Sequence, residues 1–191
     1  INRAAALNGM ALSSLCLLSS KTHTMSEAEL KQSMGDFVDL FNTVPFSDDA
    51  TIPDLSVDDL YAETMKLGRF DIKEDDYGRL ISPQPKSAIY LTYYRNNILH
   101  LFALPGLIMA CVFAHKGTSK NAILQLIAAL YPLLQRELFL HLSQDEALSH
   151  TDALVTALLD LGLLRQKGDD LLPPGAQQKQ FHSAWLLSRC M

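Results

Sequence analysis

The chain has 191 residues, of which 48% are hydrophobic and 19% charged, with a formal net charge of −5. This length allows one domain or two small ones with a substantial core, and the composition excludes long disordered stretches. The acidic balance excludes a phosphate-backbone footprint, which needs clustered lysine and arginine, so we expect no nucleic-acid partner.

The first part of the chain is predicted to form three helices followed by a β-hairpin. The apolar stretch at 4–18 follows no initiator methionine and lacks the charge pattern of a secretory signal, so we interpret it as a core helix of a fragment from a larger protein. Ser26-x-x-Glu29 has the form of a capping box, which marks a helix start. The expected elements are helices over 4–18, from Ser26 to about Phe41 and from Ser56 to Lys66, then strands over 69–72 and 79–82 with a turn at Asp76, Tyr77 and Gly78.

The second part is predicted to repeat this order after a joint at 82–86 that contains two prolines. The expected elements are a helical run over 87–114, a helix from Lys120 to about Leu142 capped by 115–119, a helix started by 149–152 and ending at 161–162, a hairpin with arms at 163–166 and 170–172, and a last helix over 177–190.

The run Ser87–Ala114 is the most ambiguous segment. Its last nineteen residues, Asn96–Ala114, carry no formal charge apart from a titratable histidine, which reaches the length of a membrane span. Pro105-Gly106 interrupts it, and its first half is polar on one side. A membrane span, a core helix and a helix that docks onto another protein part all fit this pattern locally.

An internal repeat favours the core helix. Aligning Leu67-Gly68 with Leu161-Gly162 also superposes Asp58 on Asp152 and Leu60 on Leu154. We therefore predict a mainly α fold of two tandem winged-helix-like helical units, at residues 1–84 and 85–191, each ending in a short β-hairpin. In this arrangement the run 87–114 provides the first helix of the second unit.

The search for catalytic chemistry is negative. His141, Ser143 and Asp145 are too close in sequence for triad geometry, and Glu137 with His141 gives at most two metal ligands. The three cysteines, Cys16, Cys111 and Cys190, are too far apart in sequence for a metal or disulfide pattern and favour a reducing compartment. We expect no catalytic residue, no metal site and no cofactor in this chain.

A cluster of polar side chains is the strongest candidate site. Its members lie on neighbouring helical ridges of the run 87–114 and are Tyr93, Tyr94, Arg95, Asn96, Asn97 and His100. Uncharged polar groups left unsatisfied in a dry interface cost about 1–3 kcal/mol each. Two interpretations stay open: the cluster bonds to loops of this chain, or it meets a partner domain or a lipid-like ligand.

The block Leu91-Thr-Tyr-Tyr-Arg-Asn-Asn-Ile-Leu-His-Leu-Phe-Ala-Leu-Pro105 closely resembles the C-terminal region of the bacterial membrane-bound glycerol-3-phosphate 1-O-acyltransferases. Three further blocks agree, at 2–4, 42–45 and 131–140. The resemblance implies a whole enzyme that transfers a fatty acyl group from acyl-CoA or acyl carrier protein to glycerol 3-phosphate in phospholipid synthesis. It also implies a peripheral location at the cytoplasmic face of the bacterial inner membrane.

That family works through a His-x4-Asp signature, and none of the six histidines here has an aspartate five positions later. The resemblance therefore implies a non-catalytic, soluble region that packs on its own N-terminal catalytic domain, with or without a contribution to membrane association. We expect the polar cluster to form the seam with that domain.

Two alternatives belong to other classes. A stand-alone winged-helix module for protein or DNA binding fits the repeat, but the predicted third helices carry almost no basic residues. An integral membrane segment at Ile98–Ala114 fits the apolar run, but Pro105-Gly106 and the repeat oppose it.

Overall fold

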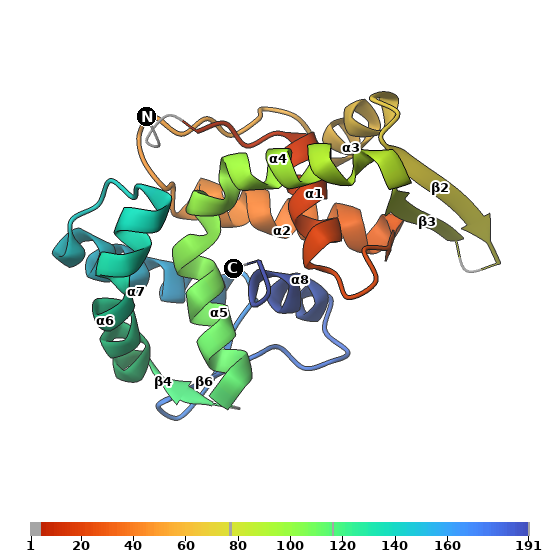
Figure 1. The fold of residues 1–191 in the computed structure, drawn as a ribbon. Coiled ribbons are helices and arrows are strands. Elements are labelled where there is room, and N and C mark those ends of the chain that lie inside the picture. The colour runs from red at the N-terminus through yellow and green to blue at the C-terminus, as the bar shows by residue number, and fades with distance from the viewer. Residues whose placement is uncertain (1–4, 77, 116, 191) are drawn as a thin grey trace.

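The computed structural model describes residues 5–76, 78–115 and 117–190, so Asn2-Arg3-Ala4 and Tyr77 of the predicted blocks and turn lie outside the described residues. The fold is mainly helical, with two small antiparallel sheets that lie apart, one with β2 and β3 at the right of Figure 1 and one with β4 and β6 at its lower edge. The predicted mainly α class with short hairpins is confirmed.

The first half contains three helices and one sheet. Its elements are α1 Gly9–Ser19, β1 Met25–Ser26, α2 Glu27–Thr43, α3 Val57–Lys66, β2 Phe70–Asp75 and β3 Gly78–Pro83. The capping box of α2 is confirmed, because the Ser26 side chain accepts from the Glu29 amide and Glu29 accepts from the Ser26 amide. Helix α1 is apolar and almost entirely buried, as the composition of 4–18 indicates.

The second half begins with two short 3₁₀ turns around a helix. Its elements are η1 Pro85–Ser87, α4 Ala88–Ile98, η2 Leu99–Phe102, α5 Ala103–His115, β4 Thr118–Ser119, α6 Lys120–Leu138, α7 Gln144–Asp160, β5 Arg165–Lys167, β6 Asp170–Leu172 and α8 Gln180–Leu187. The order α5, β4, α6, α7, β5, β6 repeats the order α1, β1, α2, α3, β2, β3.

The two sheets share one strand order. They read β1-β3-β2 and β4-β6-β5, so in each the last strand lies between the two earlier ones. The aligned residues occupy matching places: Gly68 and Gly162 both follow the third helix with positive φ. Asp58 pairs with Lys31, and Asp152 pairs with Lys120, each joining the second and third helices of its half. The winged-helix character and the boundary at 84/85 stay predictions.

One continuous hydrophobic core joins the halves. Helix α4 packs on α1, and α8 packs on both α2 and α5. The ring of Phe102 lies edge-on to Phe37 and Phe41, with centroids 5.4 and 4.9 Å apart. The Ser183 hydroxyl donates to the Asp36 carboxylate across the same junction. Burial raises the pKa of Asp36.

The run 87–114 forms two helices that meet at a bend, with α4 along the top of Figure 1 and α5 descending through the centre. Proline at 105 has no N–H, and in one continuous α-helix its ring would crowd the carbonyl of Leu101, four residues earlier. The backbone is 3₁₀ at η2, one turn before the proline, and α5 begins at Ala103, so Pro105 lies in the first turn of α5, where proline is tolerated. The expected interruption at Pro105-Gly106 is found slightly earlier than these residues.

Several predicted helix boundaries were wrong. Helix α1 begins at Gly9 and not at 4, because the Asn8 side chain caps it by accepting from the Ala11 amide. Helix α7 begins at Gln144, because Ser143 and Glu146 form a capping box there, and the expected start at 149–152 lies inside the helix. Helix α6 ends at Leu138 because Phe139 is left-handed. The last helix is shorter than 177–190 and covers only Gln180–Leu187.

Candidate docking surface on helix α4

Helix α4 has one buried side and one exposed side. Leu91 and Ile98 are fully buried, seven residues apart, and half-buried Tyr94 lies between them. The opposite side, which we call the α4 face, consists of Ile89, Tyr90, Thr92, Tyr93, Asn96 and Asn97. The buried residues recur every three or four positions and so lie on one side of the helix. The residues of the α4 face lie on the other side and are exposed to solvent in this chain.

The α4 face carries large apolar groups and no charge of its own. Ile89 is 83% exposed, Tyr93 62% and Tyr90 52%. Arg69 lies over the ring of Tyr90, at 4.7 Å from its centroid. An exposed isoleucine flanked by two exposed tyrosines is unusual for a free surface, because interface centres are rich in aromatic residues and poor in charge.

The predicted polar cluster is divided by the structure. Tyr93, Asn96 and Asn97 lie on the α4 face, whereas Tyr94 and Arg95 are half-buried. The Arg95 guanidinium donates to the side-chain oxygen of Asn96 at 3.0 and 3.2 Å. The rings of Tyr93 and Tyr94 meet edge to face at 5.8 Å.

His100 belongs to a different environment, inside the bend. It is buried in η2, and its ring lies edge-on to Phe46 at 5.4 Å. The same Phe46 contacts His141 at 4.8 Å, and His150 lines the small cavity beside them. Burial lowers the pKa of His150, and neighbouring His141 lowers it further. His100 therefore helps to pack the junction of the loop before α3 with α6 and α7.

Two grooves lie beside helix α4, and one of them adjoins the α4 face. One of about 380 Å³ is lined by Asn8, Leu55, Leu67 and Tyr94, where the described chain enters the fold and Ala5 bonds to Thr51. The other, of about 410 Å³, is lined by Asn96, Asn97, Leu99, His100, Glu137, Leu138 and Phe139. The second groove continues the α4 face through Asn96 and Asn97, whereas the first reaches helix α4 only at half-buried Tyr94.

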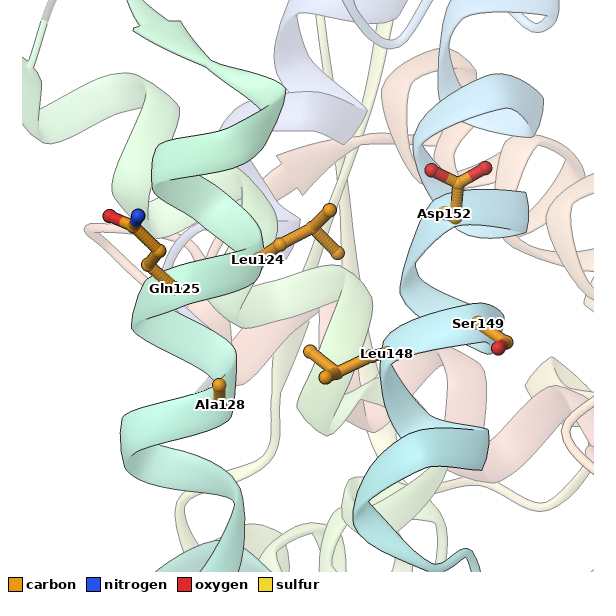
Figure 2. A pocket seen from close by; sticks show the side chains of 6 residues that line it. All are labelled: Leu124, Gln125, Ala128, Leu148, Ser149 and Asp152. Carbon is orange, nitrogen blue, oxygen red and sulfur yellow. The ribbon is translucent and has the colours of Figure 1, made fainter.

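A third groove lies between α6 and α7, and Figure 2 shows Leu124 and Leu148 pointing toward each other across it. Its volume is about 430 Å³. Pro132 leaves the carbonyl of Ala128 without a helical donor, and the Gln144 side chain donates to that oxygen at 3.0 Å. The groove is a shallow seam between two tied helices, so it is a poor candidate for a ligand site.

No catalytic centre is found in the described part of the chain. No group of three or more metal-ligating side chains occurs among the described residues. All three cysteines are free and buried. Burial raises the pKa of Cys190 to about 12 and that of Cys16 still higher, so these thiols stay protonated and unreactive.

The segment Pro85–His115 is long and apolar enough to cross a membrane by length and composition. In its most apolar window, 67% of the residues are buried within the fold. Its α5 portion packs against α6, α7 and α8, as expected for the charge-free half. Burial among three helices is typical of a core helix.

Sequence reasoning missed two exposed residues of this surface. Ile89 follows from the periodicity of Leu91 and Ile98, which assigns positions 89, 93 and 96 to the opposite side of the helix. Phe139 has no such signal, because a left-handed residue after a helix is usually glycine.

Over residues 1–191 the chain matches the family described as the glycerol-3-phosphate acyltransferase C-terminal region. It is 83% identical over its full length to a glycerol-3-phosphate acyltransferase of Alteromonas mediterranea and 50% identical over 99% of its length to one of Pseudoalteromonas atlantica. A relative from Aeromonas hydrophila is 42% identical over 83% of the chain. The chain spans only 23%, 23% and 20% of the lengths of these proteins. The resemblance seen in the sequence is thus confirmed, and the chain belongs to the family of glycerol-3-phosphate acyltransferase C-terminal regions.

Proposed function

We propose that this chain is the non-catalytic C-terminal part of a longer glycerol-3-phosphate acyltransferase and that it docks onto the upstream catalytic part through the α4 face. The longer enzyme transfers an acyl group from acyl-CoA or acyl carrier protein to glycerol 3-phosphate. It works at the cytoplasmic face of the bacterial inner membrane as a peripheral protein.

The exposed α4 face carries this proposal. Ile89, Tyr90 and Tyr93 keep more than half of their surface exposed within the chain, whereas fully burying an isoleucine alone is worth about 1.5–3 kcal/mol. The matched relatives are more than four times longer than the chain, so they contain ample sequence to cover this face.

The position of the incoming chain supports the same partner. The groove beside Tyr94 is also lined by Asn8, just inside the first described residues. Upstream sequence therefore approaches the fold beside helix α4, and a part attached there lies close to the helix that carries the α4 face. A tethered partner also binds at a high effective concentration, which favours this contact over any free one.

Charge opposes the alternative of a DNA-binding module. In a winged-helix arrangement the third helices, α3 and α7, are the ones available to a DNA groove. The first turn of α3 carries Asp58 and Asp59, and that of α7 carries Asp145 and Glu146. These carboxylates repel a phosphate backbone.

The test is a charge placed on the α4 face of the longer protein. Tyr93→Glu forces a carboxylate into the proposed seam, so we expect acyltransferase activity to fall at least tenfold. The same change in this chain alone leaves its melting temperature almost unchanged, because the side chain is exposed.

The matched control is Ala153→Glu, which adds the same charge on the exposed side of α7. We expect the control to retain activity. Full activity of Tyr93→Glu, with normal recovery in the membrane fraction, would contradict the proposal.

A further inference from the structure

Phe139 ends helix α6 in a conformation that suits glycine. Its φ is 52° and its ψ is 44°, in the left-handed region, and its side chain is 76% exposed. Apart from His23, it is the only non-glycine residue with positive φ in the described parts of the chain. Left-handed backbone costs a bulky residue free energy that glycine or asparagine avoids.

The surrounding turn forces this conformation. The Leu140 amide donates to the Gln135 carbonyl at 3.1 Å, and the Leu140 side chain is buried. The Tyr131 hydroxyl and the Gln135 side-chain amide both donate to the carbonyl of Leu142, at 2.8 and 2.7 Å. With the residues on both sides fixed, the ring at 139 is held outward.

The ring lines the groove at the end of the α4 face. Asn96 and Asn97 line the same groove, which has a volume of about 410 Å³. Neither the strained backbone nor the exposed ring stabilises this chain by itself. A binding anchor benefits from a backbone that is already fixed and from a side chain with few rotatable bonds, because little conformational freedom is then lost on binding, and Phe139 meets both conditions.

We propose that Phe139 is the anchor that fixes the upstream part of the longer protein at the end of the α4 face. The upstream part supplies an apolar socket for the ring, with hydrogen-bonding groups at its rim that meet Asn96 and Asn97. Glu137 lies on the same groove, so the rim of the socket is neutral or basic. This inference rests on the proposed function, which supplies the partner.

Cysteine labelling tests the inference in the intact proteins. Native Cys16, Cys111 and Cys190 are buried, so a cysteine introduced at an exposed position is the fast-reacting thiol of this chain. Phe139→Cys, Ile89→Cys and the control Ala153→Cys are each labelled with a maleimide, in this chain alone and in the longer protein. Mass spectrometry of the labelled peptides gives each rate.

We expect position 139 and position 89 to react at least tenfold more slowly in the longer protein, and position 153 to react equally in both. If position 89 is protected and position 139 is not, the proposed function stands and the anchor inference is wrong. If neither is protected, the docking surface itself is wrong.

A second variant separates anchoring from folding, because it should stabilise this chain alone and weaken docking in the longer protein. Phe139→Asn relieves the left-handed strain, so we expect the melting temperature of this chain to rise by roughly 2–4 °C. In the longer protein the same variant loses its anchor, and we expect position 89, as Ile89→Cys, to react at least fivefold faster than with Phe139 present. An unchanged rate at position 89 would contradict the inference even if the isolated chain were stabilised.

Discussion

Helices α4 and α5 are neighbours in sequence and belong to one apolar run, yet they meet different surroundings. Helix α5 is covered by α6, α7 and α8, whereas α4 rests on α1 and leaves Ile89, Tyr90 and Tyr93 exposed. The more apolar helix is the one whose partners lie within the chain. The less apolar one presents the surface that this chain leaves uncovered, so exposure and not hydropathy identifies the docking candidate.

The largest expected effect comes from a matched pair of isoleucines. Ile108 of α5 is fully buried, so Ile108→Ala should lower the free energy of unfolding by about 2–5 kcal/mol. Ile89 of α4 is exposed, so Ile89→Ala should change it by less than about 0.5 kcal/mol. Urea unfolding followed by the fluorescence of Trp185, the single tryptophan, measures both.

Equal losses in these two variants would break the comparison, because they would mean that α4 and α5 are covered to the same extent in the isolated chain.

A smaller effect is expected from pH at the bend between the two helices. Burial, aided by His141, lowers the pKa of His150 from its ordinary 6.5 in the folded state. The unfolded chain therefore binds more protons between the two pKa values, so stability is complete above pH about 6.5 and decreases as pH falls through the folded pKa.

The free energy of unfolding of His150→Gln should decrease less than that of the wild type as the pH falls below about 6.5. Urea unfolding at a series of pH values measures both. A profile in which wild type and variant lose stability in parallel would show that His150 is not the group responsible.

The smallest effect is expected at the proline after the bend. Pro105→Ala should lower the free energy of unfolding by about 0.4–1 kcal/mol, chiefly because the unfolded chain gains freedom. The bend itself should persist, since Phe102 is held between Phe37 and Phe41. Unchanged helical content by circular dichroism fits this account, and a clear gain of helix would show that the proline alone separates α4 from α5.

Local signals in the sequence predicted much of the fold. The Ser-x-x-Glu pattern at Ser26 located the start of α2, and the Leu-Gly pairs at 67–68 and 161–162 located the ends of both third helices. Ser143 and Glu146 carry the same pattern as Ser26 and Glu29, so the true start of α7 was available in the sequence and was overlooked.

Other features depend on tertiary structure. Strands β1 and β4 have two residues each and are defined by their pairing with β3 and β6. Two residues are too short for an alternating pattern, so the sequence alone does not predict these strands. The left-handed turn at Phe139 is imposed by bonds from Tyr131 and Gln135 to a loop that follows it. The polar cluster as a binding surface stays a prediction, and its division between exposed and buried side chains depends on the position of α1, which no local pattern gives.

The central claim is that the α4 face is covered in the longer protein, and hydroxyl-radical footprinting tests it without any substitution. Tyr90 and Tyr93 are exposed here, and buried Tyr131 serves as an internal reference. We predict that Tyr90 and Tyr93 are oxidised several-fold more slowly in the longer protein than in this chain alone, while Tyr131 is slow in both. Equal oxidation rates of Tyr90 and Tyr93 in the two proteins would contradict the claim.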